Sequence, residues 1–65
     1  MNMDIENADK AAQVAELLEQ DLMALVASPN PLVSDIALAM KEEATALRIR
    51  LERLFHNLQA METTA

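Results

Sequence analysis

Apolar residues in the second half of the chain recur in alternating steps of four and three residues. The repeat begins at Val33 and continues to Met61 with an apolar residue at every position. A repeat of about 3.5 residues is typical of an α-helix that packs against other helices through interlocking side chains. The pattern therefore predicts a helix over residues 31–61 whose seam is Val33, Ala37, Met40, Ala44, Leu47, Leu51, Leu54, Leu58 and Met61.

The first half of the chain has a second repeat of the same kind, with smaller side chains at its beginning. Asp4 precedes this repeat and can cap a helix, because its carboxylate can accept hydrogen bonds from the first backbone N–H groups. Acidic residues crowd the opening turns, where the helix dipole favours negative charge. We expect a helix over residues 4–28 with the seam Ala8, Ala11, Ala15, Leu18, Leu22 and Leu25.

The segment SPNP, residues 28–31, separates the two repeats. Pro29 and Pro31 lack the N–H group that a continuous helix needs, and each drives the residue before it out of the helical conformation. Asn30 followed by Pro31 is also a favourable helix start, with a side-chain cap and a proline at the first helical position. A short connection between amphipathic helices normally makes them antiparallel neighbours. The sequence predicts an all-α fold, one antiparallel two-helix hairpin over residues 1–65, with a turn at 28–31 and a frayed tail at 62–65.

An antiparallel hairpin that turns near Pro29 places Leu18 opposite Met40 and Ala8 opposite Leu51. Small side chains of the first helix then meet large ones of the second at the open end, an alternation that fills space without voids. The second helix is the longer of the two. We therefore expect four apolar residues near its end to extend beyond the start of the first helix and to need a covering chain: Leu54, Phe55, Leu58 and Met61.

The chain is too short to bury a large core by itself. A domain of 65 residues buries only about 60% of its unfolded surface, and one this small usually needs a disulfide, a metal or a partner chain. The sequence has no cysteine and one histidine, which leaves a partner chain as the stabiliser. We expect the hairpin to dimerise into a four-helix bundle, with an interface formed by Leu18, Leu22, Leu25, Met40, Leu47, Leu51, Leu54, Phe55, Leu58 and Met61.

The net charge of −6 disfavours binding to DNA or RNA, because nucleic-acid affinity comes largely from cations that neutralise phosphates. Most cations lie in the second half of the chain, whereas the first half is strongly acidic. Two interpretations of these cations stay open. They form salt bridges along an exposed face and to the acidic first helix, or they form a strip that contacts an anion such as phosphate. The residues concerned are Lys41, Arg48, Arg50 and Arg53.

The sequence offers little for catalysis or for a cofactor. His56 lies four residues after Glu52, so the pair shares a helix face and either supplies metal ligands or forms part of an exposed surface. Ser28 and Ser34 have no basic partner nearby in sequence, and no glycine is present for a phosphate-binding loop. We therefore expect no enzymatic activity, no cofactor and no metal site. The longest apolar run, residues 22–27, is too short for a membrane span, and the acidic first residues differ from a secretory signal, so a cytoplasmic protein is expected.

From Asp35 onward, the stretch DIALAMKEEATALRIRLERLF resembles the second helix of the Rop-type plasmid copy-number regulators. The shared features are the Asp–Ile start, an alanine one turn before a seam leucine, and Phe55 at the same spacing. The resemblance covers about a third of the chain and implies a hairpin that dimerises into an antiparallel four-helix bundle. The family binds RNA through polar, basic and aromatic residues of its first helix. In this chain the corresponding surface carries Asp9, Gln13, Glu16 and Gln20, so RNA binding does not carry over.

The turn is also similar to the proline-bracketed turn of type III secretion needle subunits, which are helical hairpins. That likeness implies a subunit of a larger helical assembly. The favoured hypothesis is a small protein-interaction module, such as an adaptor, regulator or chaperone, that binds itself and another protein. The alternatives are a nucleic-acid-binding regulator of Rop type and a helical subunit of a secretion or other assembly.

Overall fold

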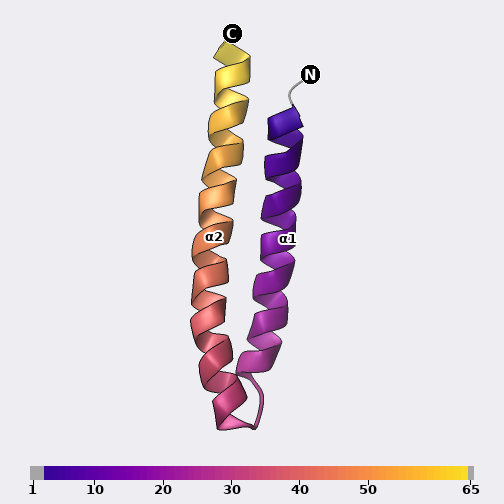
Figure 1. Ribbon diagram of the computed structural model, residues 1–65. Helices are drawn as coiled ribbons and strands as arrows, with labels where there is room; N and C mark the ends of the chain where they lie inside the picture. Colours follow the sequence, from indigo (N-terminus) through magenta and orange to yellow (C-terminus); the bar gives the residue numbers. More distant parts are fainter. Residues whose placement is uncertain (1–2, 65) are drawn as a thin grey trace.

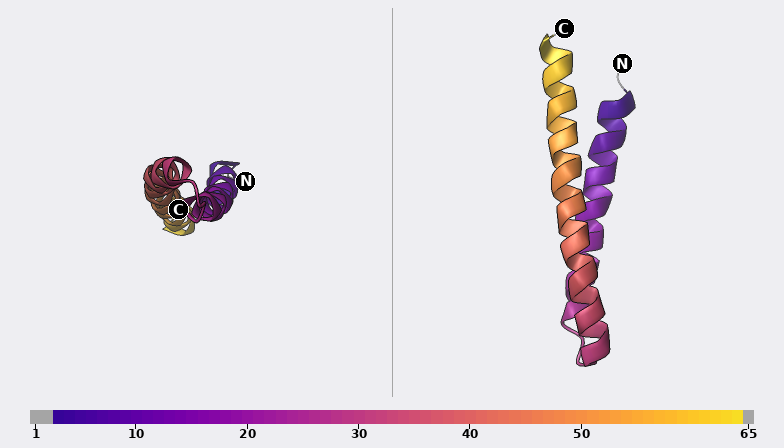
Figure 2. Two further views of the ribbon diagram at one scale, coloured as in Figure 1. Left: turned by 90° about the horizontal axis from the view of Figure 1, so that it is seen from below. Right: turned by 60° about the vertical axis from the view of Figure 1, so that its left-hand side comes forward.

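Two long helices lie side by side and antiparallel in the computed structural model, which describes residues 3–64 (Figure 1). Helix α1 is Met3–Val26 and helix α2 is Pro31–Thr64. The two helices remain neighbours along the whole of α1 when the molecule is turned (Figure 2). The structure confirms the predicted all-α helical hairpin.

Helix α1 ends at Val26, two residues before the predicted position. The Ala27 N–H still bonds the Met23 carbonyl oxygen at 3.3 Å, whereas the Ser28 N–H bonds the Leu25 carbonyl oxygen, only three residues back, at 3.0 Å. This tightening precedes Pro29, which excludes the helical conformation from the residue before it. The prolines therefore end α1 two residues before the position that the apolar pattern alone predicts.

Helix α2 begins at the predicted cap. The side-chain Oδ1 of Asn30 accepts a hydrogen bond from the Leu32 N–H at 3.0 Å, and its carbonyl oxygen accepts the Ser34 N–H at 3.0 Å. Pro31 occupies the first helical position, where its missing N–H group costs nothing. These hydrogen bonds confirm the predicted start of the second helix at Asn30 and Pro31.

Ser34 has a role that the sequence did not indicate. Its hydroxyl donates a hydrogen bond of 2.7 Å to the carbonyl oxygen of Val26, the last residue of α1. Helices often end with a glycine in the left-handed conformation that satisfies such carbonyls, but this chain has no glycine and its described backbone has no positive φ. A side chain from the next helix supplies the missing donor and ties the two helices together at the turn.

Helix α2 continues to Thr64, so the frayed tail predicted for residues 62–65 is wrong at 62–64, and Ala65 lies outside the described residues. The reason is local. Residues 59–64 contain neither glycine nor proline, and nothing in the backbone interrupts the i to i−4 hydrogen-bond pattern. The last turns of α2 therefore remain helical although only the first turn of α1 lies near them.

The core between the helices is built mainly of alanine. Small side chains let two helix axes approach closely, but they bury little apolar area. Leu51 and Leu58 continue the seam toward the open end and are only half-buried. Among the residues whose burial the structure describes, the buried ones are Ala8, Ala12, Ala15, Leu22, Ala37 and Ala44.

The shape is that of a rod rather than a closed domain. Its extents are 52 × 14 × 11 Å and its radius of gyration is 15.1 Å, against about 11 Å expected for a compact chain of this length. The accessible surface is 4874 Å², against about 4,100 Å² for a compact protein of 7.2 kDa. One hairpin therefore leaves a considerable area that a further layer could cover. Within residues 3–64, neither helix has an apolar stretch that could cross a membrane.

Candidate interaction surface

Five large apolar side chains line one side of the hairpin and remain accessible to solvent. We call them the apolar face: Leu18, Leu25, Met40, Leu47 and Leu54. Each is 40–47% exposed, whereas the buried alanines between the helices are 9% exposed or less. Isolated exposed leucines are ordinary on protein surfaces, whereas large contiguous apolar patches are typical of interaction sites.

Helical geometry explains why these residues share one side. Within the α2 seam, Met40, Leu47 and Leu54 each come three residues after a more buried member, which rotates them by about 60° away from the line of contact with α1. Leu18 and Leu25 have the same relation to the α1 seam. In an antiparallel pair this rotation brings both rows to the same side of the molecule.

Two grooves on this side confirm the arrangement. One lies near the middle of the hairpin and is lined by Leu18, Leu22, Met40, Glu43, Ala44 and Leu47. The other lies toward the open end and is lined by Asp4, Asn7, Ala8, Ala11, Leu51, Leu54 and Leu58. Leu18 and Met40 line the first groove, and Ala8 and Leu51 line the second, as antiparallel helices require. The bonds of Glu19 to Thr45 and Arg48 set α1 further along α2 than the predicted register, which placed Leu18 opposite Met40.

On the opposite side of the seam, a cluster of charged side chains connects α1 to α2. Glu19 of α1 accepts a hydrogen bond from Arg48 Nε at 3.0 Å and another from the Thr45 hydroxyl. Arg48 also donates through Nη1 to both carboxylate oxygens of Glu52, at 3.0 and 3.2 Å. The side chains of Arg48 and Glu19 are 24% and 15% exposed, so this cross-link between the helices is partly shielded from water.

The cluster shifts the ionisation of its members. The hydrogen bond from Thr45 and the hydrogen bond and positive charge of Arg48 lower the pKa of Glu19, with a further contribution from Lys41, although partial burial opposes them. The hydrogen bonds that Arg48 donates to Glu19 and Glu52 raise the pKa of Arg48. Both charges are therefore stabilised by the hairpin.

The predicted interface residues fall into three groups. Leu22 is 7% exposed and is already covered by its own chain. Leu51, Phe55 and Leu58 are half-buried, and Met61 is 67% exposed at the end of the row that contains Leu54. The remaining five, Leu18, Leu25, Met40, Leu47 and Leu54, are the apolar face.

The expected overhang of α2 beyond α1 is shorter than predicted. Leu54 and Leu58 line a groove together with Asp4 and Ala8, so they lie beside the first turns of α1 rather than beyond them. The reason is the register of the two helices. The predicted register placed Ala8 opposite Leu51, whereas the groove that Ala8 lines also contains Leu54 and Leu58, so α1 lies further along α2, toward its C-terminal end, than predicted. What leaves Leu54 exposed is the side of the helix on which it lies.

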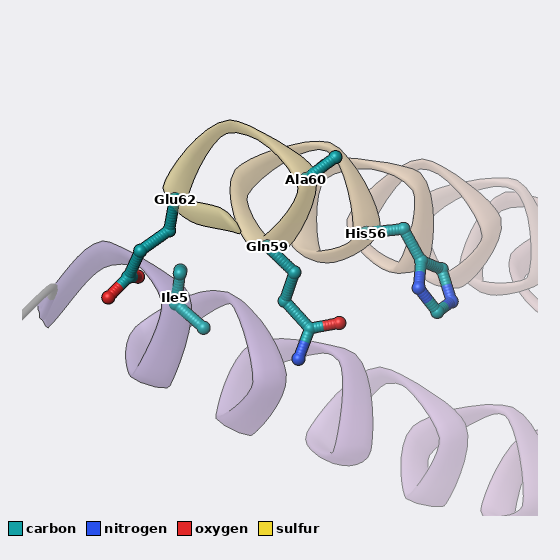
Figure 3. Close-up of a pocket in the computed structure, with 5 residues that line it drawn as sticks. All are labelled: Ile5, His56, Gln59, Ala60 and Glu62. Carbon is teal, nitrogen blue, oxygen red and sulfur yellow. The ribbon is translucent and has the colours of Figure 1, made fainter. Parts of the chain in front are cut away.

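A further hollow lies at the open end, lined by Ile5, His56, Gln59, Ala60 and Glu62. In Figure 3, Ile5 points from α1 toward α2, while Ala60 points away from α1. The His56 ring lies 5.5 Å from the Phe55 ring, centroid to centroid. The carboxylate of Glu52 is bound by Arg48, and residues 3–64 contain no group of three metal-ligating side chains.

The four cations of the predicted anion strip do not gather in one place. Lys41 and Arg48 lie on the side of the charged cluster, where Arg48 bonds two carboxylates. Arg50 comes directly before seam residue Leu51 and so lies on the side of the apolar face, and Arg53 is exposed on the outer surface of α2. For Arg48, the interpretation as a salt bridge to the acidic first helix is confirmed.

Comparison of the chain with protein-family models, with curated proteins and with solved structures found no match.

Proposed function

We propose that this protein is a small protein-interaction module that acts through its apolar face. Two hairpins pack face to face through this surface and form a four-helix bundle, whose outer surface serves an adaptor, regulatory or chaperone role toward another protein. The observation that carries the proposal is the row of five apolar side chains, each 40–47% exposed beside a core of alanines.

The asymmetry of the hairpin supports this proposal. One side of the seam carries the hydrogen bonds between Glu19, Thr45, Arg48 and Glu52, with Met23 and Leu38 exposed nearer the turn. The other side carries the apolar face along most of its length. Covering the apolar face removes hydrocarbon from water at about 25 cal/mol for each Å². A helix pair with one polar and one apolar side is suited to form half of a bundle.

Two adjacent leucines allow a sharp test. Leu18 belongs to the apolar face and is 46% exposed, whereas Leu17 is 59% exposed and points away from it on the outer surface of α1. Leu18→Glu should weaken self-association on the order of a hundredfold or more, because it places a charge in the interface. Leu17→Glu adds the same charge to an outer position and should leave association unchanged.

Sedimentation equilibrium of both variants measures the two dissociation constants directly, and far-UV circular dichroism checks that both remain helical. Equal effects of the two substitutions would contradict the proposal, since the apolar face would then be no more important than the outer surface. A larger effect of Leu17→Glu would assign association to the outer side of α1 instead.

A further inference from the structure

Glu43 and Arg50 border the apolar face of α2 and have no partner in their own hairpin. Each comes directly before a seam position, Ala44 or Leu51, so both point toward the side where a second layer would lie. Glu43 also lines the central groove beside Met40 and Leu47. Among the described residues, neither side chain makes a hydrogen bond or an ion pair, in contrast to Arg48 nearby on the same helix.

We infer that the layer covering the apolar face is a second copy of this chain turned end for end, with Glu43 of each copy paired to Arg50 of the other. The inference rests on the proposed function and specifies its partner and orientation. In this arrangement the two turns lie at opposite ends of the bundle, and α2 runs antiparallel to α2 of the partner subunit. A two-fold axis near Leu47 relates the two copies.

The spacing along α2 makes this pairing reciprocal. Glu43 and Arg50 are placed symmetrically about a point between residues 46 and 47, so one rotation forms both ion pairs at once. The same rotation sets Leu47 against Leu47 of the partner subunit and Met40 against Leu54 of the partner subunit. The apolar row and its charged border are therefore self-complementary about a single axis.

The residues of α1 are compatible with the same two-fold axis. Glu19 bonds Thr45 and Arg48, which places the middle of α1, near residues 18–19, level with the axis. Leu18 then meets Leu18 of the partner subunit, and Ala11 meets Leu25 of the partner subunit, a small residue against a large one. No like charges of α1 face each other at this level, because Val14 lies opposite Asp21 of the partner subunit.

The charge pattern disfavours the other symmetric dimer, in which both turns lie at the same end. There α1 packs beside α2 of the partner subunit, which brings Asp21 against Glu43 of the partner subunit and leaves Arg50 opposite Val14 of the partner subunit. Two carboxylates at a closing interface repel each other, and the repulsion occurs twice by symmetry. The end-for-end dimer replaces both repulsions with attractions.

Charge reversal distinguishes the two orientations by the sign of its effect. Glu43→Lys sets an ammonium group against Arg50 of the partner subunit in the end-for-end dimer and should weaken dimerisation about tenfold. In the other orientation the same substitution relieves repulsion from Asp21 and strengthens the dimer. Arg50→Glu should likewise weaken the end-for-end dimer, and the two substitutions combined in one chain should restore wild-type affinity.

Mixing the two single variants gives an independent readout. The Glu43→Lys chain carries cations at both positions, and the Arg50→Glu chain carries carboxylates at both. The mixed dimer therefore regains both ion pairs, and its fraction should be larger than random pairing of the two chains predicts. The matched control pair is Glu42→Lys and Arg53→Glu, which change the net charge identically on the outer surface of α2. These controls should show neither weakening nor preferential mixing.

Sedimentation equilibrium at low salt gives the dissociation constants, and native mass spectrometry gives the mixed fraction. Weakening by each single reversal with rescue in the double variant establishes the inference. A dimer that is indifferent to reversal, or strengthened by Glu43→Lys, overturns the orientation and leaves the proposed function intact. A wild-type chain that stays monomeric overturns both.

Discussion

Arg48 of α2 donates Nε–H to Glu19 Oε1 of α1 across the hairpin at 3.0 Å. The contact joins residues 29 positions apart in the sequence and lies on the side of the seam opposite the apolar face. Thr45, one turn before Arg48, bonds the second carboxylate oxygen of the same glutamate. Glu19 thus contacts two neighbouring turns of α2, which fixes the register of the two helices more firmly than a seam of alanines could do alone.

Acid should weaken the hairpin through Glu19. Because the pKa of Glu19 is lowered in the folded chain by Thr45 and Arg48, the unfolded chain binds more protons at this group, and stability is lost as the pH falls through the lowered pKa. The melting temperature should therefore decline over the acidic interval that begins at the ordinary pKa of a glutamate. Glu19→Gln should show a smaller decline over that interval, measured by circular dichroism at one fixed chain concentration.

Glu16→Gln is the matched control for this experiment, because Glu16 lies on the same helix at an exposed position and the ion pairs of Arg48 are with Glu19 and Glu52. It should retain the acid dependence of the wild-type chain. If Glu16→Gln and Glu19→Gln flatten the profile equally, the acid sensitivity comes from general charge rather than from the cluster.

Removal of the Ser34 hydroxyl should loosen the turn. Ser34→Ala leaves the Val26 carbonyl without its donor and should lower the free energy of unfolding by about 1 kcal/mol. Ser34→Thr retains the hydroxyl and should lose much less. Urea unfolding of the three proteins at equal chain concentration measures the difference. A Ser34→Ala protein as stable as wild type would show that water satisfies this carbonyl equally well.

The closeness of the helices depends on the alanines of the seam. Ala44 is 4% exposed, so Ala44→Leu has no space to occupy without separating α1 from α2 and should cost about 1–3 kcal/mol. Ala46→Leu makes the same substitution at an exposed position of α2 and should be nearly neutral. Thermal unfolding compares the two variants, and equal melting temperatures would contradict the close packing described for the seam.

The sequence pattern predicted the hairpin because its determinants are local. The 3.5-residue repeats, the two prolines and the Asn30 cap each act within a few residues, and the structure contains them almost as predicted. The end of α2 was missed because polar residues near residue 62 were interpreted as a tail, although none of them breaks a helix. The Ser34 bond to Val26 was missed because it joins two helices across a turn.

The pattern was less informative about which seam residues one chain can cover. It treats Ala37, Met40, Ala44 and Leu47 alike, yet the two alanines are buried and the other two are 40% and 46% exposed. The periodicity of apolar residues identifies one face of a helix. How deeply each residue of that face is buried depends on how the helix is rotated about its axis relative to the neighbouring helix. Glu43 and Arg50 were accordingly not grouped together, although their seven-residue spacing places them on one side of α2.

The most direct test of the central claim is the mass of the wild-type chain in solution, measured by light scattering after gel filtration over a wide concentration range. Coverage of the apolar face by a second copy predicts a mass of twice the 7.2 kDa chain and a melting temperature that rises with concentration. A mass of one chain at every concentration, with cooperative unfolding that does not depend on concentration, would contradict it.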